Sequence, residues 1–108
     1  MANPHRGEVE LIVNGAPVRM RLTLGALAKL ETRLETGSLM ALAERFESGR
    51  VTASDLLALL EAGIRGAGSE CPDSGLADAD IEGGTIGAMR AGLALLSAAF
   101  RPFQGDDG

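Results

Sequence analysis

The sequence predicts an α+β fold in which an N-terminal β-hairpin packs on a small bundle of four or five helices. Apolar and charged side chains alternate on both sides of Asn14-Gly15, a dipeptide typical of the type I′ turn that joins two strands. From Thr23 onward, apolar residues recur instead at the three- and four-residue spacing of amphipathic helices. Of the 108 residues, 45% are apolar but only 3% are aromatic, so we expect a core of aliphatic side chains packed mostly by helices.

The two strands are expected to pair in a single register around the Asn14-Gly15 turn. One face of the hairpin would then be apolar and the other would carry opposite charges, so that burial and cross-strand ion pairing favour the same alignment. The expected pairs are Glu8 with Arg21, Val9 with Met20, Glu10 with Arg19, Leu11 with Val18, Ile12 with Pro17, and Val13 with Ala16. The two outer edges of the hairpin would offer unpaired backbone groups to another strand.

Four helices are expected after the hairpin, each beginning at a Ser or Thr that can cap its first turn. These capping residues are Thr23, Ser38, Thr52 and Thr85. Asp55 adds a capping-box-like carboxylate to the third helix. The far end of that helix is expected to fray at three glycines, Gly63, Gly66 and Gly68. Residues 67–76 are expected to form a loop and residues 77–82 a brief acidic turn.

We expect residues 7–101 to form one α+β domain between a disordered arm, residues 1–6, and a disordered tail, residues 102–108. The arm lacks the apolar stretch of a signal peptide, and no segment approaches the apolar length of a membrane span. Cys71 is the only cysteine, which excludes an intrachain disulfide and favours the reducing cytoplasm. The formal net charge of -5 argues against binding to nucleic acid or to a membrane surface.

No arrangement of residues predicts catalysis, and we expect neither catalytic residues, nor a metal site, nor a cofactor. His5 and Cys71 are the only His and Cys, and they are too few for a metal site of the usual ligands. Ser and Thr occur mainly where helices need caps. One alternative is the segment from Asp73 to Leu76, which resembles the site at which acyl carrier proteins are modified, with Ser74 as the acceptor. The hairpin and the glycine within this segment argue against that alternative.

The last helix allows two interpretations. Its apolar residues at helical spacing can belong to the core, or they can dock on a partner, since the loop before them is long. They are Ile86, Met89, Leu93, Leu96 and Phe100. Our candidate partner-binding residues are four of these and one on the hairpin: Ile12, Met89, Leu93, Leu96 and Phe100.

Residues 7–34 resemble the gene transfer agent and phage tail assembly chaperone family, whose members some catalogues describe as tail tube components. The similarity is densest in Gly7-Glu8-Val9 and in the segment Arg21-Leu22-Thr23-Leu24-Gly25-Ala26-Leu27-Ala28-Lys29-Leu30-Glu31. It weakens through the next two helices and is faint after Glu70. The resemblance implies a non-enzymatic protein that binds the tape measure protein and tail tube subunits during tail morphogenesis, with possible self-association. The alternative it leaves open is a structural tail component that stays in the particle.

Overall fold

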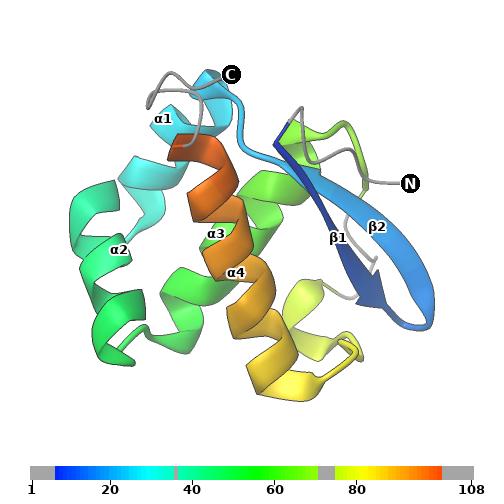
Figure 1. Cartoon of the computed structure of the whole chain (residues 1–108). Helices are drawn as coiled ribbons and strands as arrows, with labels where there is room; N and C mark the ends of the chain where they lie inside the picture. The colour runs from blue at the N-terminus through cyan, green and yellow to red at the C-terminus, as the bar shows by residue number, and fades with distance from the viewer. Residues whose placement is uncertain (1–6, 36, 71–74, 101–108) are drawn as a thin grey trace, which may run out of the picture.

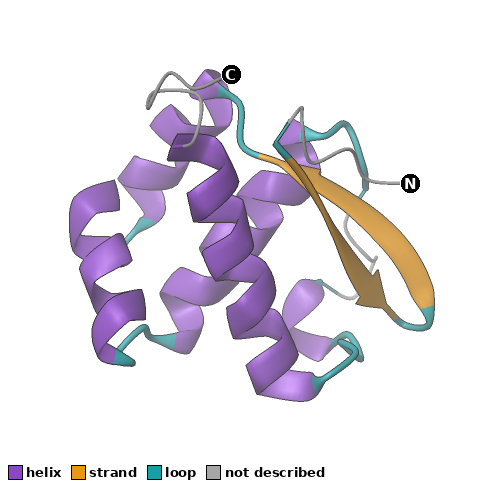
Figure 2. Ribbon diagram, in the orientation of Figure 1, coloured by secondary structure: helices purple, strands orange, loops and turns teal. Residues whose placement is uncertain are grey.

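The computed structural model describes residues 7–35, 37–70 and 75–100. It has an α+β fold made of a two-stranded antiparallel hairpin and four α-helices within these residues, as predicted (Figures 1 and 2). The elements are β1 (Glu8–Val13), β2 (Ala16–Arg21), α1 (Leu24–Arg33), α2 (Leu39–Ser48), α3 (Ala53–Gly66), the 3-10 turn η2 (Leu76–Asp78) and α4 (Gly84–Phe100). The arm and tail predicted to be disordered lie outside the described residues.

The hairpin has the predicted register at all six pairs, from Glu8 opposite Arg21 to Val13 opposite Ala16. At its turn, Asn14 has a φ of 53° and Gly15 a φ of 82°, the pair of positive values that a type I′ turn requires. The register predicted from the alternation of side chains is therefore confirmed. A one-residue slip would turn the apolar face of the hairpin toward solvent, so burial of that face favours this register.

The two faces of the hairpin differ as expected. Leu11, Val13 and Met20 are no more than 4% exposed and belong to the hydrophobic core. On the other face, Arg19 forms an ion pair with Glu8 across the strands, with 3.8 Å between the guanidinium nitrogen and the carboxylate oxygen. This ion pair is diagonal, whereas the register sets Glu8 directly opposite Arg21.

Three of the four predicted helix caps are confirmed. The side-chain oxygens of Thr23, Ser38 and Thr52 each accept a hydrogen bond from the backbone N–H three residues on, at 3.0 to 3.1 Å. The prediction for Thr85 is wrong, because α4 already begins at Gly84. Gly83 accepts the first helical hydrogen bond, from Gly87 N–H at 3.0 Å, and so takes the capping position that glycine tolerates well.

The central helix is α3, which contacts β2, α1 and α4 (Figure 1). The prediction that its glycines fray its end is wrong for Gly63 and Gly66, which lie within the helix. A Cβ at Gly63 would lie 2.7 Å from Leu95 Cδ1, and a Cβ at Gly66 would lie 2.0 Å from the Arg21 carbonyl oxygen. These two glycines let α4 and β2 approach the helix closely. Only Gly68, with a φ of 77°, takes the left-handed conformation beyond it.

The segment between α3 and α4 does more than turn the chain. Leu76 is 1% exposed in the core, and Ile81 forms an isolated antiparallel bridge with Val13. Asn14 N–H donates to Asp80 O at 2.7 Å and Glu82 N–H donates to Ile12 O at 3.0 Å, so this segment covers the outer edge of β1 near the turn. The expectation that both outer edges of the hairpin are open is therefore wrong for this part of β1.

A candidate protein-binding groove

The apolar stripe predicted on α4 is divided between core and surface. Leu96 is 2% exposed and packs in the core, whereas Ile86 is 65% exposed and Leu93 is 50% exposed. Met89 is half-buried between these extremes. The side chain of Phe100 lies outside the described residues. The core interpretation therefore holds for Leu96, whereas Ile86 and Leu93 are exposed, as docking on a partner would require.

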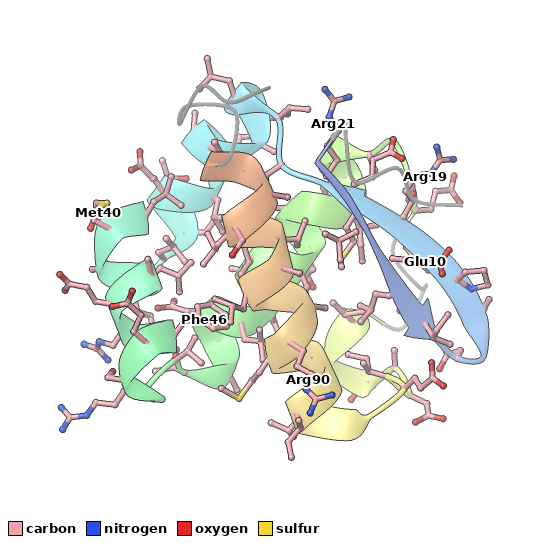
Figure 3. All side chains as sticks on the ribbon, viewed as in Figure 1. Glu10, Arg19, Arg21, Met40, Phe46 and Arg90 are labelled. Atoms are coloured by element: carbon pink, nitrogen blue, oxygen red, sulfur yellow. The ribbon has the colours of Figure 1, made fainter. Side chains whose placement is uncertain are left out.

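The core-facing side of α4 is built mostly from small residues, which sequence periodicity of large apolar residues did not single out. Ala88, Ala91 and Leu95 are buried there. A Cβ at Gly92 would lie 2.9 Å from Phe46 Cζ and 3.0 Å from Leu56 Cδ1. In Figure 3 the Phe46 ring points from α2 toward α4. The small residues bring this side of α4 close to its neighbours, whereas the larger Ile86 and Leu93 side chains lie on the opposite, exposed side of the helix.

A groove of about 420 Å³ lies between the first turns of α4, the first turns of α3 and the segment 76–81. Its lining is mainly apolar and includes Val51, Leu57, Leu76, Ile81, Ala88 and Met89. Asp80 is the only charged residue among the described residues that line it. This volume falls within the range of about 300–1,000 Å³ that is common for binding pockets. We call this cavity the apolar groove.

The apolar groove continues into the exposed part of the α4 stripe. Met89 lines the groove, and Ile86 and Leu93 lie three residues before it and four residues after it, on the same side of the helix. Arg90 lies beside them on α4 and is exposed (Figure 3). The combined surface is an apolar band bordered by Asp80 and Arg90, a surface suited to binding another apolar segment.

The five candidate partner-binding residues do not come together in one place. Met89 and Leu93 belong to the apolar groove and its extension, whereas Leu96 is in the core. Ile12 is half-buried on the hairpin, paired with Pro17, and does not line the groove. Sequence analysis missed Leu57 and Ile81 as groove residues. The alternation Asp78-Ala79-Asp80-Ile81-Glu82, which has the period of a strand, was the signal that Ile81 faces inward.

A second cavity, of about 300 Å³, lies between α1 and the last turns of α3. Every charged residue among the described residues that line it is a cation: Lys29, Arg33 and Arg65. Arg33 donates to the Glu61 carboxylate at 2.9 Å, whereas the ion pairs found among the described residues include neither Lys29 nor Arg65. Leu30 and Ala62 supply apolar lining. We call this cavity the basic pocket.

The buried carboxylate of Asp55 has a structural role that extends the predicted one. Asp55 is 1% exposed in the first turn of α3, and its own N–H donates to Thr52 Oγ1 at 3.1 Å. Its Oδ1 accepts a hydrogen bond from Glu35 N–H at 2.8 Å. Asp55 Oδ2 is buried without a hydrogen bond among the described residues. The side chain thereby links the start of α3 to the connection between α1 and α2, and its charge complements the positive end of the helix.

The described residues contain no group of three or more His, Cys, Asp and Glu placed to hold a metal ion. His5, Cys71 and Ser74, on which the metal and acyl carrier possibilities depended, lie outside them. Within the same part of the chain, no helix is both long and apolar enough to cross a membrane.

Comparison with protein families matches residues 6–102 to a family described as phage tail tube protein, GTA-gp10. The chain belongs to this family. The match spans the hairpin and all four α-helices, well beyond the segment that carried the resemblance, and it confirms the relationship to gene transfer agent and phage tails. No curated protein and no solved structure gives a significant match. The apolar groove is therefore a feature of a protein related to the phage tail tube.

Proposed function

We propose that this member of the GTA-gp10 family is a non-enzymatic tail assembly chaperone that acts in the cytoplasm. In this proposal it binds the tape measure protein and tail tube subunits while the tail of a gene transfer agent or prophage-like particle is built. The observation that supports it best is the continuity of the apolar groove with the exposed face of α4. A chaperone of this kind needs an accessible apolar surface and no reactive group.

The shape of the surface suits a helical segment as the bound partner. From Ile86 to Leu93, α4 presents its apolar side chains over about 10 Å, which is close to two turns of a helix. A partner helix with apolar residues at three- and four-residue spacing would place one side chain in the groove and others along α4. The half-buried Met89 favours such binding, because its flexible side chain adapts to partners of different shape.

A structural tail component that stays in the particle is the alternative, and the description of the family as a tail tube protein favours it. A tube subunit that closes a β-ring needs more strand than the two strands and one bridge of the described residues. For that reason we prefer the chaperone.

Mass spectrometry of purified particles distinguishes these two functions. A chaperone is expected in the producing cells but absent from finished tails, whereas a tube component is expected in the tails at a fixed ratio to the other subunits. Stoichiometric recovery from intact tails would contradict the chaperone proposal.

The role of the apolar groove is tested by coexpression with the tape measure protein and measurement of the affinity of the complex. Leu93→Glu and Met89→Glu are expected to weaken binding at least about tenfold, because the exposed half of such a side chain contributes about 1 kcal/mol when buried and the carboxylate opposes burial. Leu24→Glu is the matched control, since Leu24 is 79% exposed on α1 and does not line the groove. Equal binding by all three variants would exclude the groove as the site.

The acyl carrier possibility has its own test. Coexpression with a phosphopantetheinyl transferase would add one pantetheine group to Ser74 of a carrier protein, and intact-mass measurement detects it. We expect the mass to stay unchanged.

A further inference from the structure

Opposite charges gather at the two ends of α3. The basic pocket uses the last turns of this helix, with Ala62, Arg65 and Gly66 in its lining, whereas the apolar groove uses the first turns. The 14 residues of α3 separate these ends by about 20 Å. Charged groups at the two ends are therefore too far apart to meet within one chain.

The basic pocket is a concentration of positive charge on an acidic protein. The chain has 10 Lys and Arg against 15 Asp and Glu, yet no acidic residue is among the described residues that line this pocket. Lys29 and Arg65 are exposed at its rim, and Arg33 is already bound to Glu61. A concave surface lined by one sign of charge focuses its electrostatic potential on an incoming group of the opposite sign. The pocket therefore favours an acidic segment with some apolar surface.

This protein carries such a segment at the other end of α3. Asp78, Asp80 and Glu82 are exposed and alternate with Ala79 and Ile81, which are partly buried. We call these three acidic residues and the segment between them the acidic shoulder. It is held in place by its hydrogen bonds to the hairpin, including Asp80 N–H to Asn14 Oδ1 at 2.9 Å. Because the backbone is already ordered, docking of the shoulder would cost little conformational entropy.

We propose that copies of this protein associate head to tail, with the acidic shoulder of one copy docked in the basic pocket of the next. The two surfaces differ and lie at opposite ends of α3, so every copy keeps one unused surface after each contact. Such a contact is heterologous and continues into a chain or closes into a ring, unlike a two-fold dimer. The proposal does not depend on the chaperone function, because the contact is carried by the exposed charges of the pocket and of the shoulder. The basic pocket shares no residue with the apolar groove, whereas Ala79, Asp80 and Ile81 of the shoulder also line that groove.

Light scattering after size-exclusion chromatography, over a range of protein concentrations, tests this association. The mass of the wild-type protein is expected to rise with concentration beyond that of a dimer and to fall when salt is added, since salt screens exposed charges. A pocket variant, Lys29→Gln with Arg65→Gln, and a shoulder variant, Asp78→Asn with Asp80→Asn, are each expected to require at least about tenfold higher concentration to associate. Mixed in equal amounts, the two variants retain one intact contact and should form dimers but nothing larger.

The control variants neutralise the same numbers of charges on α2 and its end, away from both surfaces. They are Glu44→Gln with Glu47→Gln and Arg45→Gln with Arg50→Gln, and both should associate like the wild type. The proposal is overturned if the wild type is monomeric throughout, if it stops at a dimer, if neutralising either surface leaves association unchanged, or if the mixture of variants stays monomeric. The salt response of the wild type does not depend on any variant being folded, and an association that salt leaves unchanged would also overturn it.

Discussion

Gly66→Ala is expected to destabilise the protein, although alanine normally favours a helix over glycine. At an unconstrained helix position this substitution would gain about 0.5–1 kcal/mol. At Gly66, the added Cβ would lie 2.0 Å from the Arg21 carbonyl oxygen, whereas real Cβ contacts are essentially never below 3.0 Å. The obstacle is backbone, so α3 and β2 would have to separate by about 1 Å, as in overpacked cores.

The expected size of the effect follows from these opposing contributions. Overpacking costs about 1–3 kcal/mol, and the rigid partner at Gly66 places the cost at the upper end. After the gain in helix propensity is subtracted, the free energy of unfolding should fall by about 2 kcal/mol. For a domain of this size that corresponds to a decrease in Tm of roughly 10 °C.

Urea unfolding followed by far-ultraviolet circular dichroism measures this change, and the absence of Trp and Tyr leaves little choice of an intrinsic fluorescent probe. Gly25→Ala is the matched control, because Gly25 also lies in a helix but a Cβ added there would meet open space, with no neighbouring element within 4 Å. The control should gain up to about 1 kcal/mol. If Gly66→Ala were as stable as the wild type, the close approach of α3 to β2 would be refuted.

Three further predictions concern stability and are checked by the same urea titrations. Leu11→Asp should lower the free energy of unfolding by several kcal/mol, because it buries an unpaired carboxylate. Ile12→Asp, on the other face of the hairpin, should lower it far less, and similar losses in the two variants would contradict the register. Asp55→Ala should lower the free energy of unfolding by about 1.5–3 kcal/mol, because the Glu35 N–H loses a charged acceptor in a part-buried hydrogen bond. Asp55→Asn keeps an acceptor oxygen and should recover part of the loss, and an Asp55→Ala variant as stable as the wild type would show that this hydrogen bond is unimportant. Thr52→Ala should lower the free energy of unfolding by about 1 kcal/mol through loss of the helix cap, whereas Thr85→Ala should leave it unchanged. Equal losses in the two variants would indicate that Thr85 also caps its helix.

Local chemistry accounts for the parts of the fold that the sequence predicted. The hairpin register follows from alternation around Asn14-Gly15, and the caps at Thr23, Ser38 and Thr52 follow from hydrogen bonds that span three residues. Both depend only on neighbours in sequence. The turn dipeptide with the alternation on both sides of it, or a single helix turn, therefore contains enough information to place them.

The features that sequence analysis missed depend on contacts between distant segments. The hydrogen bond between Asp80 and the Asn14 side chain joins residues 66 apart. The close approach at Gly63 and Gly66 arises only when α4 and β2 pack against α3. The apolar groove is similar, since periodicity pointed to Met89 but the groove also needs walls from α3 and the segment 76–81.

The attachment of residues 80–82 to the hairpin tip has a consequence for synthesis on the ribosome. The N-terminal strands obtain their edge partner and the covering contact of α4 with β1 only after most of the chain has emerged. Because synthesis proceeds at about 5–20 residues per second, the apolar side of the hairpin stays uncovered for several seconds until the C-terminal half has been made. We therefore expect translation speed and nascent-chain binding factors to affect how much of this protein reaches the folded state.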